Sequence, residues 1–267
     1  MRDLHDLVVR IAVDAAELAR TRRAEGVAIA ASKSSLVDIV TEADREVERL
    51  VVDRIRAARP DDGILGEEGT SIAGSSGLTW VIDPIDGTVN YLYDIPAYAV
   101  SIALVEGEPD PATWVAQAGA VVDAAHGTLY EAVRGGGARR DGAAIRVADA
   151  VPAELALVAT GFGYDAERRR RQAAVVQGLI GDVRDIRRIG AAALDLAHVA
   201  SGRVNAYFER GLQPWDLAAG ALLVEEAGGV VRGWGGAKAG SEFLLAAHPH
   251  LADELAALLE PLRPREA

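Results

Sequence analysis

The stretch from Trp80 to Thr88 constrains this chain more than any other part of its sequence. Its first three residues are apolar and predict a buried strand that ends at the carboxylate of Asp83. A proline is then expected to stop the strand, and a second acid, Asp86, stands three positions after the first. Gly87 and Thr88 follow, where the N–H groups that begin a helical turn can bind an anion. Two carboxylates beside such N–H groups predict a site for a divalent cation and a phosphate.

The first half of the chain is predicted to contain two helices followed by antiparallel strands. The spacing of apolar residues predicts a helix over about 3–22, and a second from Thr41, a candidate N-cap, to before Pro60. The following strands are bounded by short turns, which favours antiparallel pairing. They are expected at Leu78–Ile82, Tyr98–Glu106, Trp114–Asp123, Thr128–Val133 and Ala144–Val147.

The second half alternates between strands and helices, which indicates an α/β layer. Strands are expected at Leu155–Thr160, Val183–Arg188, Asn205–Glu209, Val230–Val231 and Phe243–Ala247. Helices are expected at Ala166–Ile180, Ala191–Ser201, Trp215–Ala227 and Pro249–Leu262. The change of pattern predicts an α+β half over 1–149 and an α/β half over 150–267.

Composition argues against several classes of function. The formal charge of −12 disfavours a nucleic-acid surface or binding to anionic membranes, but bound cations would still permit a phosphorylated substrate. The absence of cysteine excludes disulfides, thiolate catalysis and Cys-ligated zinc. The N-terminal segment is rich in acids and unlike a signal peptide, and no apolar run is long enough to span a bilayer. We therefore expect a cytoplasmic protein.

Several acids could together bind divalent cations, although most have an ordinary explanation when taken singly. Asp44 fits a helix cap, Asp216 lies at a helix start, and Glu67 lies in a loop, whereas capping explains Asp83 and Asp86 poorly. Mg²⁺ prefers oxygen ligands, and two ions roughly 3.5–4 Å apart can assist an in-line displacement. The candidate ligands are the carboxylates of Glu67, Asp83, Asp86 and Asp216 and the carbonyl of Ile85. The Thr88 hydroxyl could orient a water and pass a proton to a carboxylate.

At this point the chain resembles the inositol monophosphatase family of Mg²⁺-dependent, lithium-sensitive phosphatases, in particular its bacterial inositol-1-monophosphatase branch. The segments 37–44, 66–69, 80–90 and 211–220 carry the resemblance, in family order and with family-like spacing. The resemblance covers the chain from about Lys33 to Gly229. It implies a layered αβαβα sandwich, usually a homodimer, that hydrolyses a small phosphorylated molecule.

The resemblance also implies ligands for two or three Mg²⁺ ions. Glu67, Asp83 and the Ile85 carbonyl would hold the first ion. Asp83 would bridge to the second, which Asp86 and Asp216 would also hold, and a weaker third ion would lie near Glu67. Attack by an activated water would be direct, with no covalent enzyme intermediate.

Catalytic and substrate-binding roles follow from the same resemblance. The implied catalytic residues are Asp44, Glu67 and Thr88, of which Thr88 and Asp44 form the pair that activates the water. The implied substrate-binding residues are Asp86, Gly87, Thr88, Gly190, Ala191, Ala192, Glu209 and Asp216. Gly87 and Thr88 would take the phosphate through their N–H groups, Glu209 would lie near the sugar or inositol hydroxyls, and Lys33 would lie on a loop that approaches the metals.

Three alternatives were weighed against this interpretation. A haloacid-dehalogenase-type phosphatase needs a nucleophilic aspartate two positions before Asp86, where this chain has Pro84, and is rejected. The same fold could act on fructose 1,6-bisphosphate, histidinol phosphate or 3′-phosphoadenosine 5′-phosphate, although the segment 89–96 favours the inositol phosphate branch. A non-catalytic binding protein is a remote alternative, because every expected ligand is present.

Overall fold

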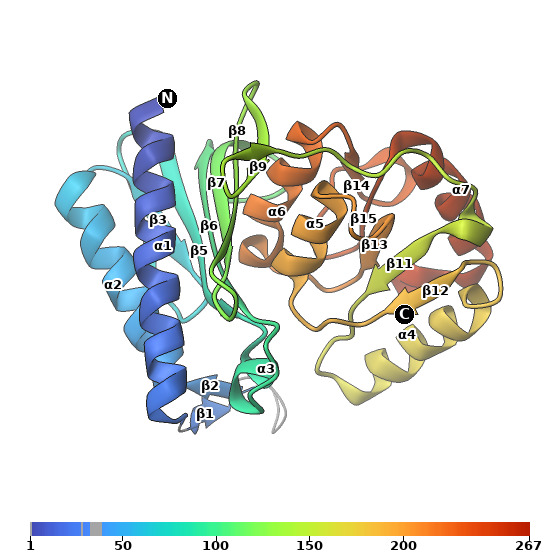
Figure 1. Cartoon of the computed structure of the whole chain (residues 1–267), viewed down its shortest axis with the longest axis horizontal. Coiled ribbons are helices and arrows are strands. Elements are labelled where there is room, and N and C mark those ends of the chain that lie inside the picture. Colours follow the sequence, from blue (N-terminus) through green and yellow to red (C-terminus); the bar gives the residue numbers. More distant parts are fainter. Residues whose placement is uncertain (1, 28, 33–38) are drawn as a thin grey trace.

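Two β-sheets and three layers of helices alternate along the long axis of the molecule (Figure 1). The computed structural model describes residues 2–27, 29–32 and 39–267. From left to right in Figure 1 the layers are α1 and α2, the first sheet, α5 and α6, the second sheet, and finally α4 and α7. The predicted αβαβα sandwich is therefore confirmed. Lys33 lies outside the described residues.

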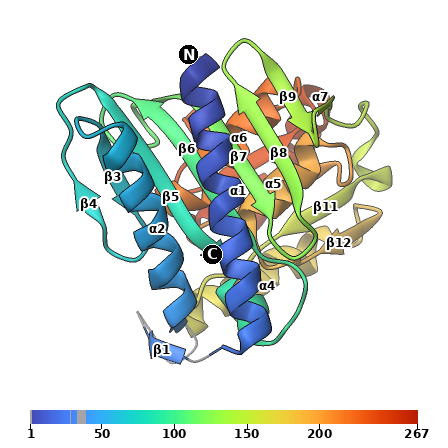
Figure 2. The same ribbon diagram turned by 60° about the vertical axis from the view of Figure 1, so that its left-hand side comes forward.

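The first sheet has eight strands in the order β10-β9-β8-β7-β6-β5-β3-β4. All of its neighbours are antiparallel except β3 and β5, which run parallel. Its outer face is covered by α1 (Arg2–Glu25) and α2 (Glu42–Ala58), which lie side by side in both views (Figure 2). The strands are β3 (Gly63–Gly66), β4 (Ser71–Ile72), β5 (Leu78–Asp86), β6 (Ala99–Glu106), β7 (Val115–Asp123), β8 (Thr128–Val133), β9 (Gly137–Arg140) and β10 (Ala143–Ala144). A separate pair, β1 (Ile29–Ser32) and β2 (Ile39–Thr41), precedes α2.

The strand that carries the acids runs further than predicted. We expected Pro84 to end it, but β5 pairs with β6 again at Asp86, opposite Ala99, after a shift of register between Asp83 and Asp86. Such a bulge leaves Pro84, which has no N–H to donate, outside the regular ladder. The two acids therefore lie at either end of a bulge on one continuous strand.

The end of the first sheet also differs from the prediction. The strand expected at Ala144–Val147 is wrong, because the chain forms a hairpin between β9 and β10 and the pairing ends at Ala144. The turn of this hairpin is at Asp141 and Gly142, both with positive φ. The sequence of β9, Gly-Ala-Arg-Arg, has no apolar alternation and was not predicted as a strand.

The second sheet has five strands in the order β12-β11-β13-β15-β14 and mixes parallel with antiparallel pairs. Helices α5 and α6 are apolar on most of their surface because they are packed between the two sheets. The helix expected over Pro249–Leu262 ends at Leu259, because Pro261 cannot donate a helical hydrogen bond, and a 3₁₀ turn follows. The strands are β11 (Leu157–Thr160), β12 (Asp185–Arg187), β13 (Ala206–Glu209), β14 (Val230–Arg232) and β15 (Leu244–Ala247). The helices are α4 (Ala166–Leu179), α5 (Ala192–Ala200), α6 (Pro214–Glu226) and α7 (Pro249–Leu259), while the short α3 (Thr88–Leu92) follows β5.

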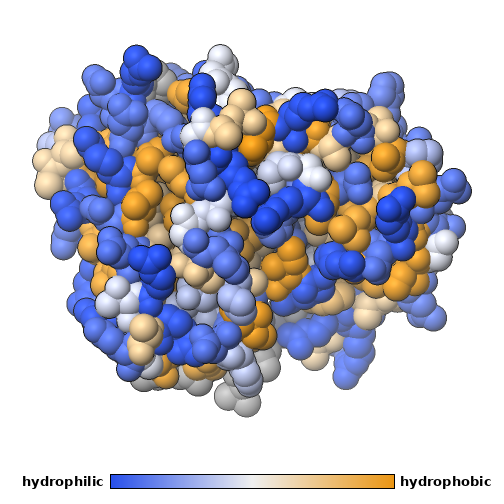
Figure 3. Space-filling view, viewed as in Figure 1, coloured by the Kyte–Doolittle hydropathy of each residue, from blue (hydrophilic) through white to orange (hydrophobic). Residues whose placement is uncertain are grey.

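The apolar core is continuous across the middle of the molecule. One buried cluster joins Val81 and Val121 of the first sheet to Leu196 of α5 and Tyr207 of the second sheet. The division at residue 149 stays a prediction. No described helix is long and apolar enough to cross a membrane, and the face shown in Figure 3 carries its hydrophobic residues in small patches between hydrophilic ones.

Candidate active site

A pocket of about 510 Å³ lies between the first sheet and the helices and loops of the second half. We call its two sides the strand wall and the helix wall. The strand wall is formed by Glu67, Asp83, Ile85, Asp86, Gly87 and Thr88. The helix wall includes Gly190, Ala191, Ala192, Asp195, Glu209 and Asp216. The structure thus brings every predicted metal and substrate residue into one pocket, and Asp44 lies directly behind it.

The strand wall is arranged by the pairing of β3 with β5. Because these strands are parallel, their carboxyl ends lie at the same edge of the sheet, with Gly66 opposite Ile82. The N–H of Glu67 donates to the carbonyl of Ile82 at 3.1 Å, so the ladder extends one residue beyond β3. Glu67 is therefore placed beside Asp83 by backbone hydrogen bonds.

A buried acid under this wall fixes the turn that carries Glu67. Glu48 of α2 is 4% exposed, and its carboxylate accepts hydrogen bonds from the N–H groups of Glu68 (2.8 Å) and Thr70 (3.2 Å) and from the Thr70 hydroxyl (2.5 Å). The sequence analysis missed Glu48, because a glutamate in an amphipathic helix is typical of a solvated face. Its only sequence signal is its place on the apolar face, three positions before Val51 and seven before Ile55.

The predicted pair of Thr88 and Asp44 lies within hydrogen-bonding reach. The Thr88 hydroxyl is 3.3 Å from Oδ1 of Asp44 and 3.1 Å from the carbonyl oxygen of Ile85. Oδ2 of Asp44 accepts from the Thr41 N–H at 2.8 Å and from the Thr41 hydroxyl, so the carboxylate is also the capping-box acid of α2. The capping bonds use Oδ2 and the contact with Thr88 uses Oδ1, so both can exist at once, and the catalytic role of Asp44 stays a prediction.

Gly87 permits the turn from β5 into α3. It caps α3 with φ +91°, in the left-handed region that disfavours other residues. A Cβ at this position would also lie 2.9 Å from the Ala97 carbonyl oxygen. The sequence prediction of a short helical turn starting at Thr88 is confirmed.

Two carboxylates of the pocket interact with the starts of helices. Asp86 reaches across from the strand wall and accepts from the N–H groups of Ala192 (3.2 Å) and Ala193 (2.7 Å) in the first turn of α5. Asp216 accepts from the N–H of Gln213 at 2.7 Å, at the start of α6. These bonds stabilise negative charge at both helix N-termini. They also show that the Ala192 N–H is used within the protein.

The crowding of acids raises their pKa values. Burial, followed by the charge of Glu67, raises the pKa of Asp83 and of Asp216 well above the usual range. Burial raises the pKa of Asp86 to about 7, although the N–H groups of α5 partly counteract this effect. One oxygen of Asp83, Oδ1, is buried without a hydrogen-bond partner.

This donor set fits a hard cation. All of the candidate ligand atoms are oxygens, and burial shields the carboxylates of Asp83, Asp86 and Asp216 from solvent. One oxygen of Asp83 has no hydrogen-bond partner. As the described side chains lie, no three or more His, Cys, Asp or Glu residues form a group that could hold a metal ion. The fit therefore rests on the chemistry and charge of the donors, and roles as metal ligands stay predictions.

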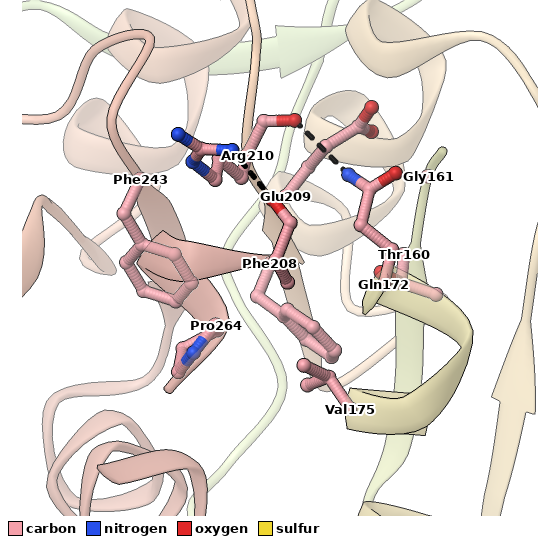
Figure 4. A pocket seen from close by; sticks show the side chains of 10 residues that line it. Thr160, Gly161, Gln172, Val175, Phe208, Glu209, Arg210, Phe243 and Pro264 are labelled. Carbon is pink, nitrogen blue, oxygen red and sulfur yellow. Dashed lines mark hydrogen bonds between the residues drawn. The ribbon is translucent and has the colours of Figure 1, made fainter. Parts of the chain in front are cut away.

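Glu209 ends β13 on the helix wall. Burial raises its pKa to about 7, although its hydrogen bond from the Tyr207 hydroxyl (2.5 Å) favours the charged form. The carboxylate lies so close to Gly161 that a Cβ there would be 1.8 Å from Oε2. Figure 4 shows the neighbouring cavity, where Gln172 of α4 donates to the carbonyl of Arg210 at 3.2 Å. That cavity measures about 10 Å³, so the larger pocket is the one that can hold a substrate.

Several residues of the pocket were not singled out from the sequence. Arg168 stands in a run of four arginines, a pattern typical of a solvated helix face, but it lines the pocket together with Arg188 and Asp195. Arg188 follows β12 and Asp195 lies in the first turn of α5. Nothing in the local sequence of Arg188 or Asp195 predicts that these residues line the pocket. Their position depends on how the second half of the chain packs beside the first sheet.

Comparison with known proteins agrees with this geometry. The chain matches the inositol monophosphatase family over residues 1–263. The inositol-1-monophosphatase SuhB of Mycobacterium tuberculosis is 44% identical over 276 residues, covering 96% of this chain and 93% of that protein. The Nus factor SuhB of Escherichia coli is 38% identical over 234 residues, covering 86% and 85%.

A solved structure shows the same fold. The extragenic suppressor protein SuhB of Bartonella henselae superposes with a TM-score of 0.88 at 32% identity, covering 97% of this chain and 98% of that one. These similarities extend over nearly the whole length of both chains. The chain therefore belongs to the inositol monophosphatase family, whose members are phosphoric monoester hydrolases that generally depend on metal ions.

Proposed function

We propose that this protein hydrolyses myo-inositol 1-phosphate to inositol and phosphate with two or three Mg²⁺ ions. The observation that carries the proposal is the strand wall, where Asp83 and Asp86 flank a bulge next to the Thr88–Asp44 pair. The curated relative in M. tuberculosis is named for this activity and is similar over most of its length.

Each wall has its own part in the proposed reaction. Mg²⁺ would be held by Glu67, Asp83, the Ile85 carbonyl, Asp86 and Asp216. When bound, it supplies positive charge that stabilises the attacking and leaving oxygens. The N–H groups of Gly87 and Thr88, at the start of α3, would bind the phosphate. Gly190, Ala191, Ala192 and Glu209 would contact the inositol.

The Thr88–Asp44 pair is suited to proton transfer from a water. The hydroxyl is 3.3 Å from a carboxylate whose other oxygen is fixed by two hydrogen bonds from Thr41. Thr88 can accept a hydrogen bond from the attacking water while it donates to Asp44, which aligns the water for in-line attack. In this scheme the water attacks the phosphorus directly, the inositol oxygen leaves, and no side chain becomes phosphorylated.

Phosphate release from inositol 1-phosphate, with Mg²⁺ or with EDTA, tests the proposal. Fructose 1,6-bisphosphate, histidinol phosphate and 3′-phosphoadenosine 5′-phosphate are compared at the same concentrations. We expect Mg²⁺-dependent release that is fastest from inositol 1-phosphate. Faster release from another substrate would overturn the choice of substrate, and no Mg²⁺-dependent release from any would overturn the proposed activity.

The name of the E. coli relative, Nus factor, refers to a role other than hydrolysis. A binding role without catalysis remains the alternative, and the assay above separates the two. The homodimer, the cytoplasmic location and the absence of nucleic-acid and membrane partners stay predictions.

A further inference from the structure

Asp195 is a buried acid in the pocket that none of the roles above uses. It lies in the first turn of α5 and is one of the residues that line the pocket. The residue is 1% exposed, and its Oδ1 is buried without a hydrogen-bond partner. Buried carboxylates are normally paired, so an unpaired one at a pocket indicates that a ligand or water completes it.

Only one other carboxylate oxygen among the described residues shares this state. It is Oδ1 of Asp83, at the centre of the proposed metal site. The two acids have different neighbours, however. The charges of Glu67, Asp86 and Asp216 raise the pKa of Asp83, whereas the pKa of Asp195 is raised by the charges of Glu209 and Asp86 and lowered by that of Arg188. Asp195 therefore belongs to the part of the pocket beside Glu209.

The ligand of Asp195 is unlike the scissile phosphate. Burial and the charges of Glu209 and Asp86 raise the pKa of Asp195 well above its usual range, and Arg188 partly opposes this. An anionic phosphate facing two buried acids would be repelled. The N–H groups of Ala192 and Ala193 already donate to Asp86, so this helix start does not offer them to an anion. Hydroxyl groups, which can both donate and accept, complement a pair of buried carboxyls.

We propose that Asp195 hydrogen-bonds a hydroxyl of the leaving alcohol, next to the hydroxyl bound by Glu209, and so selects polyol phosphates. This inference rests on the proposed function. A site built to bind a hydroxyl discriminates against esters that lack it, because the buried polar group is then left unpaired. Asp195 is thus a specificity-determining residue, whereas the strand wall acts on the phosphate.

The test compares two substrates that differ in the leaving alcohol. Inositol 1-phosphate offers several hydroxyls, and p-nitrophenyl phosphate offers none. For Asp195→Ala we expect the ratio of kcat/KM for inositol phosphate to that for p-nitrophenyl phosphate to fall roughly tenfold, mainly through KM. Asp195→Asn keeps a hydrogen-bonding group and should lose about threefold or less.

A matched control removes another buried acid. Asp62 is 0% exposed and accepts from the Trp80 indole at 3.0 Å, outside the residues that line the pocket. Asp62→Asn should lower the melting temperature without changing the substrate ratio. Mg²⁺ binding, measured by calorimetry, should be the same in Asp195→Asn as in the unmodified protein.

Three outcomes would overturn the inference. One is an equal fall of kcat/KM for both substrates in both Asp195 variants, which indicates a structural role. Another is weaker Mg²⁺ binding with an unchanged ratio, which indicates a metal ligand. The third applies if Asp195→Ala does not fold: the ratio of kcat/KM for the two substrates is then unchanged in Asp195→Asn and in Asp195→Ser. Absence of hydrolysis by the unmodified protein is a different failure, because it overturns the proposed function itself.

Discussion

The two walls of the pocket differ in how their side chains are held in place. On the strand wall, Glu67, Asp83 and Asp86 come from neighbouring strands of one sheet, and backbone ladders set their spacing. On the helix wall, Asp195, Glu209 and Asp216 come from two helix starts and a strand end in three consecutive elements, α5, β13 and α6. The strand wall is therefore set by hydrogen bonds within one sheet, whereas the helix wall is set by the packing of α5 against α6 and β13.

The walls also differ in their electrostatics. The strand wall gathers Glu67, Asp83 and Asp86, and burial, followed by the charge of Glu67, raises the pKa of Asp83. The helix wall supplies N–H groups, and α5 uses two of them to bind Asp86 from the opposite side. This cross-pocket contact is what joins the two walls. We therefore expect changes on the strand wall and at Asp216 to affect catalysis and metal binding, and changes at Asp195 and Glu209 to affect selectivity.

The largest effect is expected for Asp83→Asn. The substitution removes a proposed metal ligand and also the negative charge that would balance the charge of the bound Mg²⁺. We therefore expect kcat to fall by roughly a thousandfold or more. The measurement is phosphate release at saturating Mg²⁺. Asp123→Asn, on β7, is the control, because Asp123 is a buried acid bonded to His126 outside the pocket lining. A near-normal rate for Asp83→Asn would remove the strand wall from catalysis.

A smaller loss is expected for Thr88→Ala. Removing the hydroxyl deletes the link between the water and Asp44, which costs roughly a hundredfold in kcat for a group of this kind. KM should change little, because the N–H of residue 88 is kept. Thr88→Ser retains the hydroxyl and should recover most of the rate. If the alanine and serine variants have the same kcat, the hydroxyl does not activate the water.

The difference between the walls explains which residues of the pocket could be predicted from the sequence. Asp83, Asp86 and Thr88 were predicted because one short segment contains the strand, the acids and the turn. The predicted end of this strand at Pro84 was wrong, because a bulge lets the strand continue past a residue that cannot pair. The layered fold was implied by the family resemblance, and the change of pattern near residue 149 predicted only that the two halves differ. Strand β9, with its two arginines, was missed because its sequence has no alternation.

Contacts between distant segments could not be predicted. Glu48 looked like a surface glutamate until the pairing of β3 with β5 placed the 66–70 turn above α2. Asp195 looked like an ordinary acid in the first turn of a helix, a favourable position in itself. The meaning of both residues depends on packing, which local patterns do not contain.

Glu48→Gln tests whether the strand wall needs support from below. An amide offers an N–H₂ group toward the N–H donors of Glu68 or Thr70, so the turn that carries Glu67 loses an acceptor. Loss of such supporting contacts typically weakens metal binding by roughly tenfold or more. The measurement is Mg²⁺ affinity by calorimetry.

The control for Glu48→Gln is a substitution at the start of β3, the strand whose end leads into the 66–70 turn. Asp62 directly precedes β3 and is equally buried, so Asp62→Asn disturbs the start of the strand while leaving the 66–70 turn intact. We expect it to lower stability without weakening Mg²⁺ binding. Equal Mg²⁺ affinities in both variants would show that the turn does not depend on Glu48.

The smallest effect is a pH dependence of stability to which both walls contribute. Asp86 and Glu209 lose their protons near pH 7 in the folded protein, but near pH 4 when unfolded, with ordinary values of 3.8 and 4.5. Between these limits the folded state binds more protons, so the free energy of unfolding decreases as pH rises. In EDTA we expect the melting temperature to fall by roughly 5 °C between pH 5 and pH 8. Calorimetry at several pH values measures this fall.

Variants then divide the slope between the walls. Asp86→Asn removes the contribution of one acid of the strand wall and Glu209→Gln that of one acid of the helix wall, so each should flatten part of the pH dependence. Mg²⁺ binds deprotonated carboxylates, so its stabilising effect should be larger at pH 8 than at pH 5 if the strand wall holds it. Glu209→Gln should keep that difference and Asp86→Asn should reduce it. A melting temperature that rises with pH in EDTA would mean that these acids are already compensated, and the electrostatic contrast between the walls would then be wrong.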